Sequence, residues 1–266
     1  MASGEGLPDP VVPADAYDEA YYLEWNMGYE EWKADPGAPI HGTYSYALQR
    51  AGLAAGEVLV DVGTGRGELL ALAMQRGAAR AVGLEYSEAA VALAHRTLEA
   101  HGADAEVLLA DARAVPLPDA VADLVTMLDV VEHLSQDELH RALCEARRIL
   151  KPGGRIIAHT FPNRLIYDVT YRWQRRLVPG RRARWPKQPR GELEASMHVN
   201  EQSRGSLRKA LNAAGFRDVQ VGFGHMIHDT IVPEADAGAR TTLHRLAAHR
   251  PTHPFGRADL WARGLA

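Results

Sequence analysis

The sequence predicts an α/β fold in which parallel strands form a doubly wound sheet between helices. Between about residues 55 and 160, short apolar segments alternate with helical patterns, an order typical of parallel sheets. A glycine-rich turn follows the first of these segments, and acidic residues stand at the ends of the second and third. These features predict a ligand site at the carboxyl ends of the strands.

The first strand and its turn are the most informative stretch of the chain. Residues 59–67 read Leu-Val-Asp-Val-Gly-Thr-Gly-Arg-Gly. The glycines allow a tight turn in which no side chain separates a ligand from the backbone. We expect a helix to begin at about Arg66 or Gly67, so that its N–H groups and its dipole face the turn. The stretch therefore predicts a nucleotide-type cradle.

The following elements continue the alternation of strand and helix. Ser87 is a candidate N-cap for the helix after the second strand, and Ser203 is one for a helix expected at 207–214. The residues Lys151-Pro-Gly-Gly form a helix stop signal. The expected order is a helix at 68–76, strands at 80–85, 105–110 and 122–128, a helix at 136–150 and a fifth strand at 155–160.

This pattern resembles the class I S-adenosylmethionine (SAM) methyltransferases. The spacing Gly-x-Gly-x-Gly, preceded by Asp61, is similar to motif I of that family, whereas dinucleotide-binding proteins have Gly-x-Gly-x-x-Gly. Asp123 before the fourth strand and Leu-Lys-Pro-Gly-Gly before the fifth match the family as well. The resemblance covers roughly residues 55–160 and implies a Rossmann-like, doubly wound sheet of seven strands, with an N-terminal helical lid and an inserted segment on the substrate side.

The resemblance also implies which residues bind SAM. Asp61 would lie near the methionine amino group, Glu85 would accept the ribose hydroxyls, and Asp111 would accept the adenine amino group. The alternatives are that Glu85 is an exposed residue at the start of a helix and that Asp111 is an ordinary turn residue. The expected cofactor-binding residues are Asp61, Gly63, Thr64, Gly65, Glu85, Tyr86, Asp111, Ala112, Asp129 and Tyr22.

Length and composition suit one α/β domain with additions. The chain has 266 residues, one cysteine and a net charge of −4, so no intrachain disulfide and no overall nucleic-acid footprint are expected. We expect a cytoplasmic protein with no membrane partner, since neither a signal peptide nor a spanning apolar run is visible. The expected regions are a lid at 1–53, a SAM-binding domain at 54–235 with an insertion at about 161–200, and an extension at 236–266 with a helix near 239–249 and a loose tail.

Two added segments carry candidate substrate contacts. Six aromatic residues lie between Tyr17 and Trp32, and helical spacing indicates that most of them pack in the core. Tyr21 and Tyr22 are the leading ligand contacts. Arg172 and Arg176 share a helix face with Arg175. This basic segment would contact RNA bases together with its aromatics, bind a phosphate or carboxylate, or be solvated. His228 is a further candidate substrate contact.

His133 is the leading catalytic candidate, because it follows the fourth strand and imidazole titrates near neutral pH. Glu132 and His198 complete the candidate catalytic set. The sequence Asp129-x-x-Glu132-His133 resembles a motif that holds a divalent cation in small-RNA 2′-O-methyltransferases and certain quinone O-methyltransferases. Asp129, Glu132, His133 and His198 are therefore candidate metal ligands. The alternative is that His133 faces the site without a metal. His159, Asn163 and His225 are weaker candidates, and the alternative for His159 is a hydrogen-bonded histidine buried in the fifth strand.

The resemblance implies a SAM-dependent methyltransferase acting on a small molecule. We expect it to serve bacterial specialised metabolism, with an anionic acceptor that bears a phosphate or diphosphate. The alternatives are an RNA methyltransferase, although nucleic acid is the less favoured partner, and a SAM-binding protein without catalysis. The sequence predicts no oligomeric state.

Overall fold

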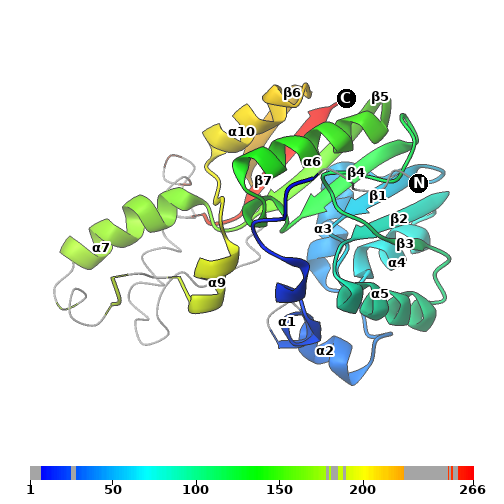
Figure 1. The fold of residues 1–266 in the computed structure, drawn as a ribbon, viewed down its shortest axis with the longest axis horizontal. Coiled ribbons are helices and arrows are strands. Elements are labelled where there is room, and N and C mark those ends of the chain that lie inside the picture. Colours follow the sequence, from blue (N-terminus) through cyan, green and yellow to red (C-terminus); the bar gives the residue numbers. More distant parts are fainter. Residues whose placement is uncertain are drawn as a thin grey trace.

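The computed structural model describes residues 7–24, 28–177, 180, 185–187, 190–224, 251, 253 and 257–266. A seven-stranded sheet in the order β3-β2-β1-β4-β5-β7-β6 forms its centre (Figure 1). Strands β1 to β5 pair in parallel, and β7 pairs antiparallel with both β5 and β6. The predicted doubly wound sheet of seven strands is confirmed. The strands are β1 (Val58–Val62), β2 (Arg80–Glu85), β3 (Glu106–Leu109), β4 (Ala122–Leu128), β5 (Leu150–Thr160), β6 (Arg217–Phe223) and β7 (Leu260–Leu265).

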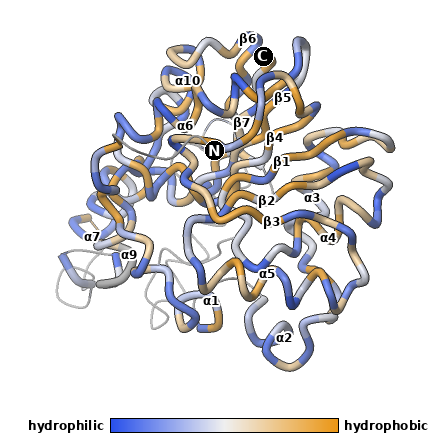
Figure 2. Tube along the Cα trace, turned by 45° about the vertical axis from the view of Figure 1, so that its right-hand side comes forward, coloured by the Kyte–Doolittle hydropathy of each residue, from blue (hydrophilic) through white to orange (hydrophobic). Residues whose placement is uncertain are grey.

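Each face of the sheet has its own hydrophobic core. Leu59 and Val60 are adjacent in β1, yet they belong to different cores, because successive side chains of a strand point to opposite faces. Helices α3 (Gly42–Ala51), α4 (Glu68–Gln75) and α5 (Glu88–His101) cover one face. Helices α6 (Gln136–Ile149) and α10 (Arg204–Ala213) cover the other. Figure 2 shows the resulting apolar strands between more polar helices.

Side chains at the starts of helices confirm two predicted caps. The Ser87 hydroxyl accepts a hydrogen bond from the Ala90 N–H, and the Ser203 hydroxyl accepts one from the Ser206 N–H. Ser135 and Glu138 form a full capping box at the start of α6. Capping of this kind satisfies N–H groups that have no partner inside the helix. These caps fix where the helices begin relative to the strand ends.

The N-terminal segment packs beside the carboxyl end of the sheet. It contains η1 (Ala14–Ala16), α1 (Glu19–Glu24) and α2 (Tyr29–Ala34). Trp32 is buried, and its indole N–H donates to the Thr97 hydroxyl at 2.7 Å. Tyr17 and Tyr22 are buried as well. This segment is therefore anchored by its own aromatic side chains, as the helical spacing predicts.

The segment after β5 extends away from the sheet (Figure 1). A π-helical stretch, η3 (Ile166–Tyr171), continues directly into α7 (Arg172–Leu177), and α9 (Glu192–Met197) returns toward the sheet. The Tyr171 ring stacks on Trp185 with centroids 4.9 Å apart. Its hydroxyl donates to the Pro186 carbonyl at 2.9 Å. These contacts hold the start of α7 in place.

The structure corrects three sequence expectations. The loose tail is wrong for residues 260–265, which form β7 between β5 and β6. The fifth strand begins at Leu150, directly after α6, and a register shift in its pairing with β4 accommodates Lys151-Pro-Gly-Gly. Helix α10 begins at Arg204, earlier than the expected Leu207. The helix expected near 239–249 lies outside the described residues.

Candidate active site

A cavity of about 460 Å³ lies at the carboxyl ends of the central strands. All residues predicted to bind SAM line it, from Asp61 in β1 to Asp129 after β4. Tyr21, Glu132, His133 and His198 line it too. The topology explains this convergence, because parallel strands bring their carboxyl ends to one edge of the sheet.

The glycine turn packs closely against the next loop. Gly63 has φ +72°, and a Cβ atom placed on it would lie 2.3 Å from Cγ2 of Val130. Its N–H donates to the Leu84 carbonyl at 2.8 Å. Glycine at this position therefore supplies both a left-handed backbone and room for the neighbouring loop. Helix α4 begins immediately after Gly67, as predicted to within two residues.

The Glu85 carboxylate organises the turn beside it. One oxygen accepts the Gly65 N–H at 3.0 Å, and the other accepts the N–H groups of Tyr86 and Ser87 at 2.9 and 3.0 Å. Burial raises the pKa of Glu85, and these three bonds partly offset that shift. The reading of Glu85 as an exposed helix-start residue is wrong, since the side chain is buried in the cavity wall.

Asp61 lies at the floor of the same region. It is buried and accepts a 2.6 Å hydrogen bond from the Thr126 hydroxyl of β4. Burial raises the pKa of Asp61 to about 7, against the lowering effect of hydrogen bonds from Thr126 and Thr64. A nearby positive group would favour its ionised form.

Asp111 forms an ion pair that the sequence reasoning did not include. Arg113 approaches Asp111 with its side-chain N–H groups at 2.7–3.0 Å and also reaches Glu138 at 3.0 Å. The Arg113 guanidinium donates to the Pro8 carbonyl as well, at 3.0 Å. Asp111 and Arg113 both line the cavity. Asp111 and Arg113 stand two positions apart just after β3, and this was the only sign of the ion pair in the sequence.

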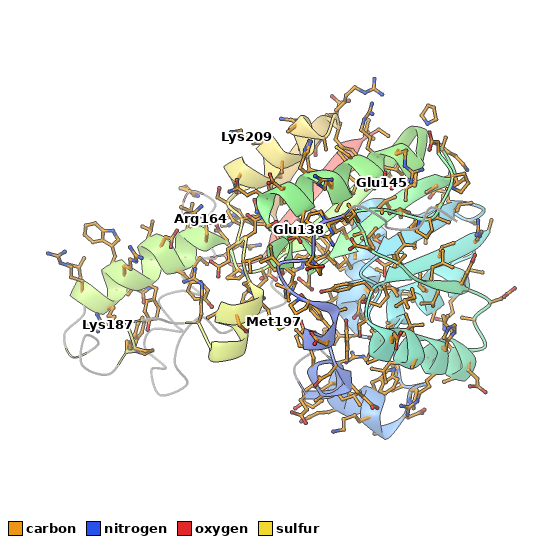
Figure 3. The ribbon with its side chains drawn as sticks, in the orientation of Figure 1. Glu138, Glu145, Arg164, Lys187, Met197 and Lys209 are labelled. Atoms are coloured by element: carbon orange, nitrogen blue, oxygen red, sulfur yellow. The ribbon has the colours of Figure 1, made fainter. Side chains whose placement is uncertain are left out.

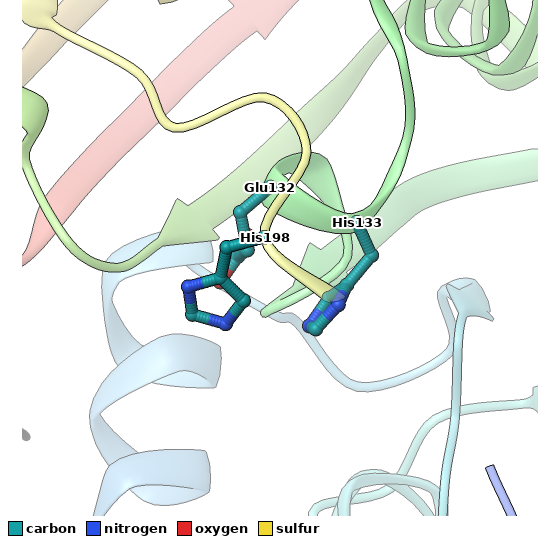
Figure 4. Close-up of side chains that lie close together, drawn as sticks. All are labelled: Glu132, His133 and His198. Atoms are coloured by element: carbon teal, nitrogen blue, oxygen red, sulfur yellow. The ribbon is translucent and has the colours of Figure 1, made fainter. Parts of the chain in front are cut away.

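Glu132, His133 and His198 come together at the other end of the cavity (Figure 4). Potential ligand atoms of these three residues all lie within 4.8 Å of one another. The short helix η2 (Val131–His133) carries the first two, and the Asn200 N–H donates to the Glu132 carbonyl at 3.0 Å. That bond holds the segment containing His198 against η2. Asp129 is not a member of this group.

Burial shifts the protonation of this group toward neutral forms. It raises the pKa of Glu132 to about 8 and lowers the pKa of His133 to about 4. The Glu132 carboxyl accepts the Thr160 hydroxyl at 2.8 Å and the Phe161 N–H at 3.2 Å. The His133 ring meets Tyr17 and His198 edge to face, at centroid distances of 5.6 and 4.9 Å. His133 is thus a neutral imidazole at pH 7, beside two aromatic rings.

A second polar chain runs under the cavity through His159. Its Nδ1 lies 2.7 Å from Asp129 and its Nε2 lies 3.1 Å from Asp259. Burial lowers the pKa of His159, but the two carboxylates outweigh it and raise the pKa to about 10. The expectation of a hydrogen-bonded, buried histidine is confirmed. Asp259 and Trp261, which also lines the cavity, carried no sequence signal because they lie in the expected loose tail.

The predicted substrate arginines do not lie at this cavity. Arg172 and Arg176 are exposed on α7, and neither belongs to its lining. His228 and His225 lie outside the described residues. Tyr21 lines the cavity, next to Tyr17 and Tyr22 at centroid distances of 5.1 Å each.

Comparisons with known proteins agree with this geometry. Residues 60–158 match the family model described as "Methyltransferase domain". Over 105 residues, the chain is 36% identical to demethylmenaquinone methyltransferase of Thermus thermophilus, covering 39% of this chain and 47% of that protein. It is 32% identical over 131 residues to a ubiquinone/menaquinone biosynthesis C-methyltransferase of Cupriavidus taiwanensis, covering 47% of this chain and 53% of that one. The chain thus spans about half the length of these relatives.

A longer match is to a Mycolicibacterium smegmatis protein described as a "probable S-adenosylmethionine-dependent methyltransferase". It is 30% identical over 186 residues, 69% of this chain and 60% of that one. Among solved structures, a methyltransferase from Archaeoglobus fulgidus covers 90% of this chain and 100% of its own, with TM-score 0.56 and 20% identity. The [4+2]-cyclase SpnF covers 97% and 96%, with TM-score 0.61 and 20% identity. These two likenesses establish the shared fold. No helix in the described part of the chain is long and apolar enough to cross a membrane.

Proposed function

We propose that this chain, which belongs to the class I SAM-dependent methyltransferase family, transfers the methyl group of SAM to a small organic molecule. One observation carries the proposal: every residue expected to bind SAM lines the same cavity as the candidate catalytic residues. SAM supplies an electrophilic methyl group on a sulfonium, so the protein has to bring donor and acceptor into line. The bacterial relatives support a place in bacterial small-molecule biosynthesis.

The cofactor end of the cavity fits an adenosyl and a methionyl group. Each Glu85 oxygen has two acceptor positions, and the oxygen bonded to Gly65 retains one for a ribose hydroxyl. Asp61 is buried at this end, and a cationic amino group beside it would stabilise its ionised form. Asp111 would receive the adenine amino group only by sharing its carboxylate with Arg113, which already contacts both of its oxygens.

The acceptor end favours a neutral ring-bearing molecule. Tyr17, Tyr21, Phe161 and Trp261 line it, and aromatic walls suit planar apolar ligands. The expected anionic acceptor rested on the basic segment from Arg172 to Lys187 and on the candidate metal site. Of that segment, Arg172 and Arg176 do not belong to the cavity lining. Arg66 and Arg113, the arginines that do line the cavity, are paired with acidic side chains. The quinone-type names of two relatives are consistent with a hydroxylated aromatic acceptor.

His133 is the proposed proton acceptor. Burial lowers its pKa and keeps the imidazole neutral at pH 7, so it can accept a hydrogen bond from an acceptor hydroxyl. Transfer of that proton in the course of methyl transfer makes the hydroxyl oxygen a better nucleophile and activates the ring carbons next to it. The same group therefore serves methylation at oxygen or at carbon.

A divalent cation is the second candidate occupant of this end, favoured by the grouping of Glu132, His133 and His198. These donors, a carboxylate and two imidazoles, suit Zn²⁺ or Mn²⁺. A metal-bound His133 would not act as a base, so the two roles exclude each other. Titrating the chelator-treated protein with Mn²⁺ or Zn²⁺ separates them, since binding that is lost in His198→Ala supports the cation and no binding supports the base.

Methyl transfer is tested with isotopically labelled SAM and a panel of hydroxylated aromatic compounds, followed by mass spectrometry. A labelled product that requires the wild-type protein supports the proposal. Labelling of RNA and of no small molecule would favour the RNA alternative. Tight binding of S-adenosylhomocysteine (SAH) without any labelled product across the panel would favour a binding protein.

A further inference from the structure

The inserted segment has a charge opposite to the rest of the molecule. Residues 161–190 contain nine arginines and lysines and one aspartate, so they carry +8 while the remaining residues together carry −12. The net charge of −4 hides this division. A cluster of positive charges on an otherwise acidic protein favours binding to an anionic partner.

Helix α7 in this segment exposes apolar side chains among its cations. Trp173 is 59% exposed and Leu177 is 63% exposed, the two highest values among the exposed large apolar residues of the described chain. They are four residues apart and form one row along the helix, and Arg172 and Arg176 form the neighbouring exposed row. Tryptophan and leucine beside arginine are the residues of helices that lie in a membrane interface.

In the part of the chain that the structure describes, this face of α7 is exposed. The helix projects from the body of the protein (Figure 1), and in Figure 3 Lys187 lies on the same side as α7, whereas Lys209 lies on α10 above the sheet. Tyr171 anchors the base of the helix through Trp185 and Pro186. The exposed side chains are therefore held on a fixed helix that can approach a flat surface.

We propose that the α7 face formed by Arg172, Trp173, Arg176 and Leu177 binds the surface of an anionic lipid membrane. The arginines would meet the negative headgroups and the apolar pair would enter the interface. Charge alone would suit RNA equally well, but the exposed Trp173 and Leu177 favour lipid, because a leucine contributes nothing to base stacking. The expectation of no membrane partner rested on the lack of a spanning segment, and surface binding requires none.

The same segment connects this face with the cavity. Gly191, Met197 and His198 line the cavity and follow α7 in the chain. Arg190 forms an ion pair with Glu201, which holds the returning chain in place. A membrane-bound protein would thus receive an apolar acceptor at the end of the cavity where we place methyl transfer. This access route rests on the proposed function, but binding to the membrane does not.

Vesicle sedimentation with the full chain tests the surface. Vesicles of phosphatidylglycerol and phosphatidylcholine in equal parts are compared with pure phosphatidylcholine, at about 0.1 M salt, where charges still act over roughly 10 Å. We expect binding to the anionic vesicles at least tenfold stronger than to the neutral ones. Equal binding to both, or none to either, would overturn the proposal.

Variants assign the binding to α7. Each basic residue near an anionic membrane contributes about fivefold, so R172E/R176E should weaken binding by about 25-fold or more. The matched control R208E/K209E makes the same charge change on exposed positions of α10 and should leave binding within about threefold of wild type, since α10 lies on a different part of the molecule. An equal loss in both double variants would refute the assignment to α7.

Variants of Trp173 and Leu177 distinguish binding to lipid from binding to nucleic acid. W173S/L177S keeps the charge and should weaken vesicle binding by at least tenfold. Wild-type affinity for vesicles in this variant, or single-stranded RNA that displaces the protein from vesicles, would contradict the membrane assignment. SAH titration of every variant should give wild-type affinity. Vesicle binding by a protein that does not bind SAH would refute the proposed function and leave the membrane face standing.

Discussion

The two ends of the cavity are assembled in different ways. At the cofactor end, Asp61, Glu85 and Asp111 lie at or near the carboxyl ends of three successive strands. All three come from one stretch of about fifty residues. At the acceptor end, the lining comes from Tyr17 and Tyr21, η2, the segment before α10, and β7. The cofactor end is therefore specified by local motifs, whereas the acceptor end depends on tertiary contacts between distant segments.

The largest effect is expected at the cofactor end. Glu85→Ala leaves the N–H groups of Gly65, Tyr86 and Ser87 without their acceptor, at a cost of about 1–3 kcal/mol each. We expect SAH affinity to fall at least about a hundredfold and the free energy of unfolding to fall as well, both measured by titration on purified protein. Unchanged affinity would remove Glu85 from the cofactor site.

At the acceptor end, His159→Gln tests the buried chain to Asp129 and Asp259. The variant leaves the fully buried Asp259 without its charged partner, and we expect a loss of about 3–5 kcal/mol in unfolding free energy near neutral pH. Adding Asp259→Asn should restore much of that loss. A double variant no more stable than His159→Gln would show that the charge pair is not the cause.

The same pair predicts a pH dependence. His159 has a folded-state pKa of about 10 and an unfolded value of about 6.5. Its stabilising effect is complete below about pH 6.5 and is lost as the pH rises through about 10. The difference in unfolding free energy between wild type and His159→Gln should therefore shrink steadily from pH 7 to pH 10. A difference that stays constant over this range would contradict a charged His159.

His133→Ala should separate the two ends functionally. We expect methyl transfer to fall by at least about a hundredfold, the usual scale for a general base, while SAH affinity stays within a few fold of wild type. Parallel assays with labelled SAM and calorimetry give both values. If transfer survives, His133 is not the base, and if SAH affinity collapses, the ends are not independent.

The smallest effect is expected in the glycine turn. Gly63→Ala meets Val130 and adopts a left-handed φ, whereas Gly52→Ala has a similar φ of +65° and no atom within 4 Å of its Cβ. Both changes should cost about 1 kcal/mol of backbone strain. Only Gly63→Ala should add a further loss of about 1–3 kcal/mol, and a weaker SAH affinity. Equal losses in denaturant titrations would show that Val130 accommodates the methyl group.

The sequence predicted that Asp61, Glu85 and Asp111 would lie together near the strand ends, and they line one cavity. This convergence was predictable because each element that carries them is short and continuous. Glycines, strand and acid lie within a few residues of each other, so local propensity and spacing suffice. The place of β7 was missed because its pairing is non-local: it meets β5 across about a hundred residues of sequence separation and β6 across about forty. Asp259 and Trp261 were missed with it.

Two further outcomes also depended on tertiary structure. Arg172 and Arg176 were expected at the substrate because their helical spacing is clear, but spacing says nothing about where a helix points. The grouping of His133 with His198 was predicted from a resemblance, and η2 and the Asn200 N–H bring the two rings together. Tertiary placement, not residue type, decided which of these predictions reached the cavity.

Calorimetric titration of the wild-type protein with SAH shows whether the cavity is a cofactor site. We expect one site with micromolar affinity, lost in Glu85→Ala and kept in His133→Ala. A folded wild-type protein that does not bind SAH would contradict the cofactor site, and with it the proposed methyl transfer.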